Sequence, residues 1–198
     1  GDCLLFGPVG RGVLRLCDEC TQPSVKLFGF RAFEALLAHA EKLPAERASD
    51  DALSSLLSAG VQLLWDHWEV SFQSLTGMLR PLLKRILALM HARELATASA
   101  DGATSHPPPT PAWLRALLER VRAMDWTRRA KYRSIQAALP LLPRGTASLL
   151  DAWPSLLAEI FSSLSIPNYQ SFASELLADL MRSLQPDDAS ATEAAAAA

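Results

Sequence analysis

Apolar residues recur along this chain at intervals of three and four, which is the spacing of a buried helix face. In residues 23–43, for example, Val25, Phe28, Ala32 and Leu36 form an inward stripe that Phe33 and Leu37 widen. No segment alternates apolar and polar residues as a half-buried strand does. The pattern therefore predicts an all-α protein with eight helices, over residues 9–20, 23–43 and 50–67, from the tryptophans at 65–68 to about 95, and from about 110, 125, 154 and 168.

Glycine, proline and composition refine this outline. Gly60 lies in the leucine stripe of the third helix, where the missing side chain would let a neighbouring helix approach closely. Pro81 should kink the fourth helix or restart it. The seventh helix is expected to bury Phe161. Residues 97–110 lack periodicity and contain three consecutive prolines, which predicts a mobile loop, and the Ala-rich tail 185–198 should be disordered.

Eight helices form four hairpins at a spacing of about forty residues, the period of HEAT and armadillo repeats. We therefore expect residues 1–184 to form a HEAT/armadillo-like α-solenoid of antiparallel helix pairs, with a compact helical bundle as the alternative. Residue 1 is glycine rather than methionine, so we expect a segment of a longer protein. No run of eighteen or so uncharged apolar residues is present, which argues against a membrane span.

Charge is unevenly distributed. The whole chain has a formal charge of −2, but residues 76–133 carry eleven Lys and Arg against four acids, while the flanking segments are acidic. A basic centre suits contact with a polyanion, although charges also simply cover a solvated face. The candidate RNA-binding residues are Arg80, Lys84, Arg85, Arg129 and Arg133.

Helical spacing assigns directions to these side chains. Arg80, Lys84 and His91 share one face of the fourth helix, and Arg129, Arg133 and Gln136 share the expected outward face of the sixth. Lys131 should instead point inward. Because a buried ammonium needs a partner, Asp125 or an acid on an adjacent helix is expected beside it, and Asp125 should also cap the sixth helix.

No catalytic or cofactor-binding constellation appears in the sequence. The glycines at 7–12 lack a preceding strand and a terminal Lys-Ser/Thr pair, so they do not form a phosphate-binding loop. Cys17 and Cys20 have the spacing of one helical turn, without suitable further metal ligands. Asp66, His67 and Glu69 would fan around a helix axis rather than converge. We expect no enzyme activity, cofactor or metal, and three cysteines fit a reducing, cytoplasmic compartment.

Three short motifs follow one another across residues 53–184: Trp-Asp-His-Trp-Glu at 65–69, Asp-Trp-Thr-Arg-Arg-Ala-Lys-Tyr at 125–132 and Ala-Ser-Glu-Leu-Leu at 173–177. In sequence and in order they resemble motifs of the thyroid adenoma-associated protein (THADA) family. The structural-motif residues are Trp65, His67, Trp68, Glu69, Trp126, Lys131 and Tyr132. Residues 70–77 depart from the family, which has a proline and a Gly-Val-Arg-His-Gln-like stretch there, and its Arg-Arg-Ser-Ala-Gly-Leu-Pro motif is absent.

The resemblance implies a non-catalytic helical-repeat scaffold. Such a subunit would bind tRNA and an S-adenosylmethionine-dependent 2′-O-methyltransferase, and would promote ribose methylation of the anticodon loop. The alternative is a protein-interaction solenoid without RNA binding, such as an assembly or trafficking adaptor. Salt-dependent binding of tRNA would separate the two. At least two of Trp65, Trp68 and Trp126 are expected to be largely buried at helix junctions.

Overall fold

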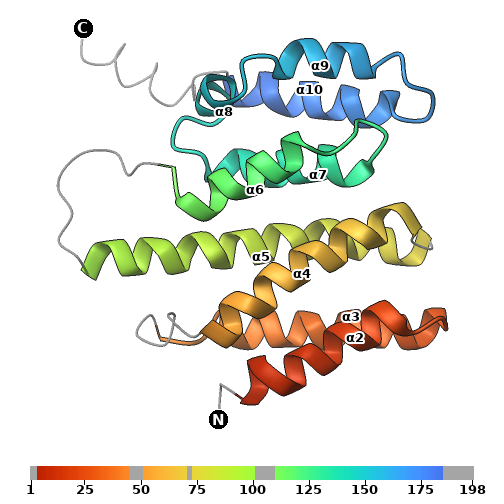
Figure 1. The fold of residues 1–198 in the computed structure, drawn as a ribbon, viewed down its shortest axis with the longest axis vertical. Coiled ribbons are helices and arrows are strands. Elements are labelled where there is room, and N and C mark those ends of the chain that lie inside the picture. The colour runs from red at the N-terminus through yellow and green to blue at the C-terminus, as the bar shows by residue number, and fades with distance from the viewer. Residues whose placement is uncertain (1–3, 45–50, 71–72, 101–109, 185–198) are drawn as a thin grey trace, which may run out of the picture. The chain divides into compact units, whose positions relative to one another are not determined.

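The computed structural model describes residues 4–44, 51–70, 73–100 and 110–184, and these form helices and connecting turns without any strand. The all-α class is therefore confirmed. The chain divides into two compact units, residues 1–117 and 118–198, and the division falls inside helix α6 (Ala112–Arg122). Figure 1 shows the helices in chain order, and each unit is described by itself.

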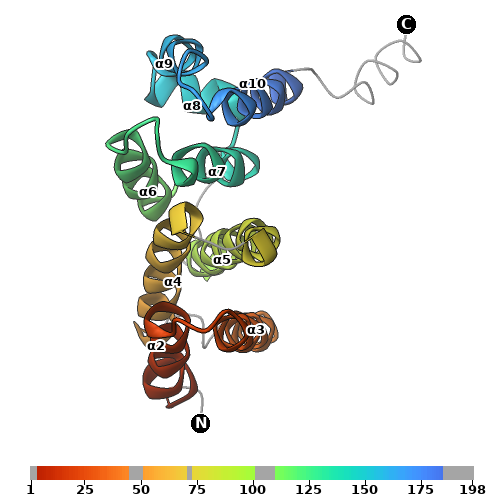
Figure 2. The ribbon, with the colours of Figure 1, turned by 90° about the vertical axis from the view of Figure 1, so that its right-hand side faces the viewer.

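The first unit contains a π-helical turn η1 (Leu5–Val9) followed by α2 (Gly10–Glu19), α3 (Pro23–Ala40), α4 (Asp51–Val70) and α5 (Gln73–Ala100). Helix α2 packs against α3 and α4, and α5 packs against the same two helices. Within this unit α2 and α4 form one layer while α3 and α5 form the other (Figure 2). Buried aromatic and aliphatic side chains fill the space between the layers, including Phe30, Phe33, Leu37, Leu57, Leu64, Leu79 and Ile86.

The inward face of α3 differs in part from the expected one. Phe33 and Leu37 are fully buried as expected, but Phe28 is 71% exposed and Phe30 is fully buried. The reason is the contact between α3 and α2, because a Cβ on Gly29 would lie only 2.9 Å from Cys17 Sγ. The glycine lets α2 approach there, and Phe28, the next residue back along the helix, is turned outward.

The expected role of Gly60 is confirmed. A Cβ at this position would lie 2.6 Å from Phe33 Cζ on α3 and 3.2 Å from Ile86 Cδ1 on α5. Two helices therefore reach α4 at the same point, and only glycine fits without displacing a ring.

Helix α5 is longer and more continuous than expected. Pro81 lies inside it on the exposed side, so the helix does not restart there. Losing one backbone donor is least disruptive on that side, where water can hydrogen-bond the freed carbonyl. The helix also continues to Ala100 instead of ending near residue 95, which corrects the predicted loop at its start. Residues 101–109 of that loop and the 185–198 tail lie outside the described residues.

The second unit contains the end of α6, then α7 (Arg129–Ala138), a 3-10 turn η3 (Leu139–Leu141), α8 (Thr146–Ala152), α9 (Leu156–Ser163) and α10 (Gln170–Leu184). Helix α10 packs against α7, α8 and α9. The short helix α8 was not expected from the sequence. Phe161 is 59% exposed, so its predicted burial is wrong, and Leu156 and Ile160 supply the buried side of α9.

Candidate nucleic-acid interface

The first tryptophan motif, residues 65–69, lies near the C-terminal end of α4, and its side chains connect α4 to α2 and α3. Trp65 and Trp68 are 2% and 3% exposed, which confirms their expected burial. His67 is also buried, with Nδ1 3.0 Å from the Leu63 carbonyl oxygen and Nε2 2.9 Å from Lys26 Nζ on α3. A lysine ammonium can only donate, so Nε2 accepts that bond and Nδ1 donates to Leu63. The Cys17 carbonyl oxygen of α2 lies 3.1 Å from the same Nε2.

The remaining polar groups near this motif do not converge on a reaction centre. Asp66 and Glu69 are exposed, and Asp66 accepts hydrogen bonds from Gln62 one turn earlier. Burial raises the pKa of the Cys17 thiol to about 12, so it stays protonated and unreactive near neutral pH. Among the residues that the structure describes, no group of three or more His, Cys, Asp or Glu could hold a metal ion.

The second motif forms the turn between α6 and α7. Asp125 Oδ1 accepts hydrogen bonds from the Thr127 backbone N–H and hydroxyl, both at 2.7 Å. These two bonds lower the pKa of the Asp125 carboxyl. Because α7 begins at Arg129, after this turn, Asp125 stabilises the turn and does not cap the helix as expected.

Lys131 is buried beneath this turn, as its inward direction predicted, and only 1% of it is exposed. Its Nζ donates to the carbonyl oxygens of Arg122, the last residue of α6, at 3.1 Å and of Met124, two residues beyond the helix, at 2.7 Å. The hydrogen bonds of the ammonium therefore go to backbone carbonyls, while the expected acids, Asp125 and Glu159 on the adjacent α9, act on it through their charge. The ammonium also lies 4.2 Å from the ring centroid of Trp126 and 5.0 Å from that of Trp153. Burial lowers its pKa, opposed by the nearby charges of Glu159 and Asp125.

Glu159 of α9 accepts hydrogen bonds from several side chains around this lysine. Its carboxylate accepts hydrogen bonds from Trp126 Nε1 at 3.1 Å, Trp153 Nε1 at 2.9 Å and Ser155 Oγ at 2.7 Å. Partial burial raises the pKa of this carboxyl, but these three bonds and the charge of Lys131 outweigh it, so the pKa is lowered overall. The arrangement fastens α9 to the α6–α7 turn.

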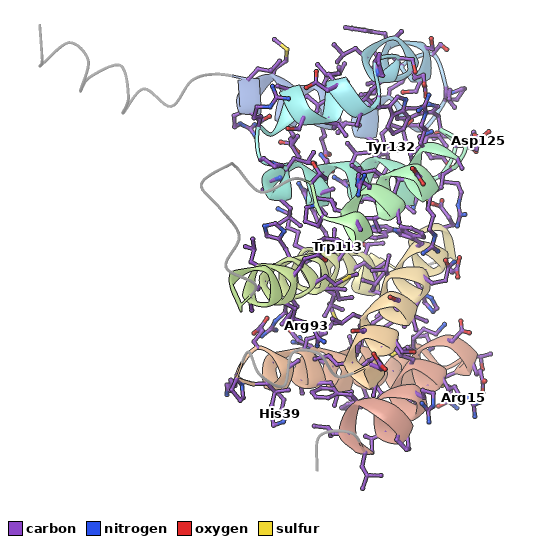
Figure 3. All side chains as sticks on the ribbon, turned by 60° about the vertical axis from the view of Figure 1, so that its left-hand side comes forward. Arg15, His39, Arg93, Trp113, Asp125 and Tyr132 are labelled. Atoms are coloured by element: carbon purple, nitrogen blue, oxygen red, sulfur yellow. The ribbon has the colours of Figure 1, made fainter. Side chains whose placement is uncertain are left out.

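Tyr132 completes the motif. Its hydroxyl donates to the Trp126 carbonyl oxygen at 2.9 Å, and its ring stacks on Tyr169 with centroids 6.2 Å apart. Side chains of the motif thus hold the α6–α7 turn against α9 and the start of α10. Figure 3 shows Asp125 and Tyr132 at this turn. Sequence reasoning missed Trp153 and Glu159 as members of this cluster, because no periodicity links them to residue 131.

The five candidate RNA-binding residues have different surroundings. Arg133 Nη1 donates to Glu175 at 2.5 Å and to Gln136 at 2.9 Å, and Gln136 is buried and donates to Asp179. The face of α7 that carries Arg133 and Gln136 is therefore not outward, because α10 packs on it. Arg129 is half-buried, with its guanidinium 5.8 Å from the Phe172 ring centroid.

In the first unit, Arg85 is ion-paired with Glu41, where Nη2 and Oε2 lie 2.5 Å apart. Lys84 is exposed and Arg80 is half-buried on the same helix. His91, expected to share their face, is half-buried with its ring edge toward Trp113 at a centroid distance of 6.5 Å. Two of the five candidates, Arg85 and Arg133, thus form ion pairs with acids of the same unit, which offset their charge.

Charge also separates the two layers of the first unit. Helix α4 contains no lysine or arginine but carries Asp51, Asp66 and Glu69. Helix α5 contains three arginines and a lysine against the single acid Glu94. A polyanion would therefore approach this unit from the side of α5 rather than that of α4.

Comparisons with models of protein families, with curated proteins and with solved structures give no match. Among the described helices, none combines the length and the hydropathy that a membrane span requires.

Proposed function

We propose that this chain is a helical-repeat segment of a THADA-like scaffold, which binds tRNA and a 2′-O-methyltransferase and promotes ribose methylation of the anticodon loop. Two observations support a scaffold. In the first unit the first helices of the pairs α2/α3 and α4/α5 contact each other, and so do the second helices. Stacked HEAT or armadillo repeats pack in the same way. The residues that carry the family resemblance, Trp65, His67 and Lys131 among them, fix helix junctions rather than line a reaction centre.

The proposed tRNA contact rests on the charge of α5. Lys84 is exposed on a helix with a clear excess of cations, and it makes no ion pair with the residues that the structure describes. Neutralising phosphates releases counterions, which supplies much of the affinity of proteins for nucleic acid. Lys84 is therefore the leading phosphate contact, and Arg80, one turn earlier on the same helix, is a second candidate. Arg85 and Arg133 are weaker candidates because their guanidinium groups pair with acids, and Arg129 lies against the Phe172 ring.

The test is tRNA binding across a salt series. We expect Lys84→Glu and Arg80→Glu each to weaken binding of all tRNAs alike, and to lower the slope of log affinity against log salt by about one unit per lost contact. Arg15→Glu is the matched control, since Arg15 is an exposed residue of α2 and the substitution changes the charge by the same amount as Arg80→Glu or Lys84→Glu (Figure 3). Equal affinity and slope for the α5 variants and the parent would remove α5 from the tRNA path.

The methyltransferase partner needs a separate experiment. The chain should co-purify with a methyltransferase when the two are expressed together, and the complex should methylate a tRNA anticodon loop faster than the methyltransferase alone. An unchanged methylation rate in a stable complex would contradict the regulatory role.

One observation favours the second candidate, a protein-interaction solenoid without RNA binding. Arg85 and Arg133 are held in ion pairs with Glu41 and Glu175, and Arg129 and Arg133 both lie over the Phe172 ring. If the parent chain binds tRNA only weakly, with no dependence on salt, the adaptor function is the better account.

A further inference from the structure

Apolar side chains lie exposed along one side of α9 and α10 in the second unit. Phe161, Met181 and Leu184 are each about half exposed or more. They belong to two stripes with helical spacing, which are Leu157, Phe161 and Leu164 at α9 and Leu177, Met181 and Leu184 on α10. Because α9 and α10 pack against each other, the two stripes form one surface, which we call the α9/α10 face.

The α9/α10 face points away from the helices that precede it. Met181 lies two residues from Asp179, which accepts a hydrogen bond from Gln136 of α7. Phe161 lies two residues from Glu159, which binds the α6–α7 turn. Two residues correspond to about 200° around a helix, so each stripe lies nearly opposite those contacts.

A second face of this kind occurs in the first unit. Phe28 is largely exposed, and Val9 and Leu16 are exposed as well. Their stripes are Val9, Val13 and Leu16 on η1 and α2, and Val25, Phe28 and Ala32 on α3. Helices α2 and α3 pack against each other, so these six residues form what we call the α2/α3 face.

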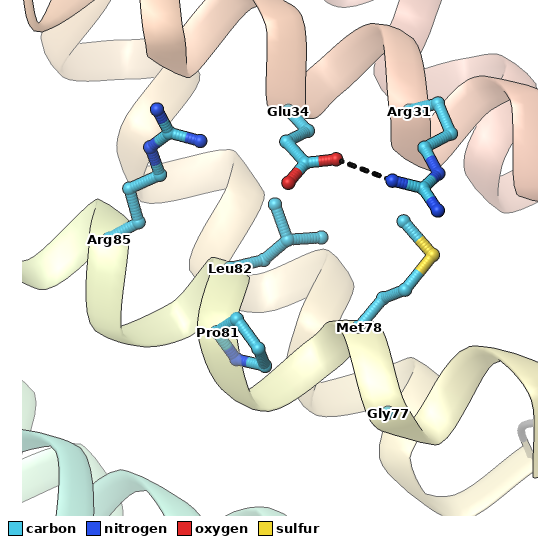
Figure 4. Close-up of a pocket in the computed structure, with 7 residues that line it drawn as sticks. All are labelled: Arg31, Glu34, Gly77, Met78, Pro81, Leu82 and Arg85. Atoms are coloured by element: carbon cyan, nitrogen blue, oxygen red, sulfur yellow. Dashed lines mark hydrogen bonds and ion pairs between the residues drawn. The ribbon is translucent and has the colours of Figure 1, made fainter.

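The α2/α3 face points away from α4 and α5. Phe33 contacts α4, and Glu34 lines a pocket of about 160 Å³ between α3 and α5 (Figure 4). Phe28 precedes these two residues by five and six positions, which places it about 120–140° from them around α3. On α2, Leu16 likewise lies about 120° from Gly10, which meets α4.

Both faces consist of apolar residues without a charge. Helix α9 carries only Glu159, on its opposite side, and Arg182 of α10 is paired with Asp179. A terminal repeat that meets water normally has a polar outer face. An uncharged face offers nothing to phosphates or to charged peptides, so its partner must present an apolar, uncharged surface in turn.

We propose that the partner is a second copy of this chain, with the α9/α10 face of one copy packed head to tail on the α2/α3 face of the next. The molecule uses the same stacking internally. First helices contact each other in α2 and α4, second helices do so in α3 and α5, and α10 contacts α7, the second helix of the preceding pair. Continued between copies, this stacking places α2 on α9 and α3 on α10, so that two stripes meet two stripes.

The size of the faces sets the expected strength of the contact. Helix α10 has 15 residues and is therefore about 22 Å long, and two neighbouring helices are about 20 Å wide. The contact then buries about 450 Å² on each copy, or about 900 Å² in total, which is small for a specific interface. We therefore expect a weak association, with a dissociation constant of about 10–100 μM.

The test is sedimentation velocity of the whole chain, free of nucleic acid, from about 1 to 300 μM. The average sedimentation coefficient should rise with concentration beyond that of a dimer, because a head-to-tail contact can add further copies. Phe28→Glu and Met181→Glu should each weaken association at least tenfold, since a carboxylate would be buried unpaired. Leu95→Glu is the matched control, because Leu95 is an exposed apolar residue of α5 outside both faces. Thermal melts verify that all three variants fold.

A mixture of the two weakened variants distinguishes a head-to-tail contact from any other. Phe28→Glu retains its α9/α10 face and Met181→Glu retains its α2/α3 face, so together they should form a 1:1 dimer with the affinity of the parent contact. The proposal is overturned if the parent stays monomeric, if the mixture does, or if Leu95→Glu also loses association. Association of Phe28→Glu alone would instead show a symmetric contact between two α9/α10 faces and would overturn it too. Because no nucleic acid is present, none of these results depends on tRNA binding.

Discussion

Replacing Lys131 by methionine isolates the contribution of the buried ammonium at the α6–α7 turn. Methionine has a similar length and flexibility, so it can fill the space beneath Trp126 and Trp153. The substitution removes the hydrogen bonds to the carbonyl oxygens of Arg122 and Met124, and it removes the cation–π contacts with both rings. Packing is thereby largely retained while the electrostatic interactions are lost.

The magnitude follows from opposing effects. A hydrogen bond from a charged donor contributes about 1.5–3 kcal/mol net, and a desolvated cation–π contact contributes about 0.5–2 kcal/mol. Two effects reduce this sum. Methionine avoids the cost of burying an ammonium, and the freed carbonyls belong to an exposed residue, Arg122, and a half-buried one, Met124, so the cost of leaving them unpaired is reduced. We therefore expect Lys131→Met to lower the free energy of unfolding by about 2 kcal/mol.

Urea unfolding followed by circular dichroism and tryptophan fluorescence measures this change. Lys84→Met is the matched control, because it removes an exposed ammonium and should change the stability by less than about 0.5 kcal/mol. A Lys131→Met variant as stable as the parent, or more stable, would refute the reasoning. It would mean that the desolvation of the ammonium outweighs all of its contacts, as happens for some buried ion pairs.

Three further predictions concern single side chains. Gly60→Ala should destabilise the first unit by about 1–3 kcal/mol because its Cβ meets the Phe33 ring, whereas Gly77→Ala, in open space, should stabilise by about 0.5–1 kcal/mol in the same melts. Trp68→Ala should cost about 3–5 kcal/mol, and a melt matching the parent would contradict its burial. Because the folded-state pKa of Glu159 is lowered, the stabilisation by its carboxylate is present above the unfolded-state pKa and is lost as pH falls. Glu159→Gln should therefore flatten the curve of stability against pH below about pH 5. An unaltered curve would exclude this role of Glu159.

Periodicity predicted the helices well but not the rotation of every one. The leucine stripe of α4 and the close approach at Gly60 follow from spacing alone, since that stripe has one dominant side. In α3 apolar residues occur on more than one side, so spacing could not choose between Phe28 and Phe30. The contact of Gly29 with Cys17 made the choice, and that contact depends on the partner helix.

The candidate site was predictable only in part for a related reason. The inward direction of Lys131 follows from its helical position. Its partners do not, because backbone carbonyls at a helix end leave no mark in the sequence. Trp153 and Glu159 join the cluster from elements 22 and 28 positions further along the chain. Only the packing of α9 against the turn brings them together.

Arg133 shows why charge summed along a segment is a poor measure of a binding surface. Its segment, residues 76–133, is strongly basic, and the segment that follows is acidic. Folding lays Glu175 and Asp179 of the acidic segment against Arg133 and Gln136, so charges that are far apart in sequence cancel in space. In the first unit Glu41 does the same for Arg85. The potential available to a polyanion therefore depends on which cations lack a facing acid. Of the five candidate residues, Arg85 and Arg133 face acids, whereas the exposed Lys84 makes no ion pair with the residues that the structure describes.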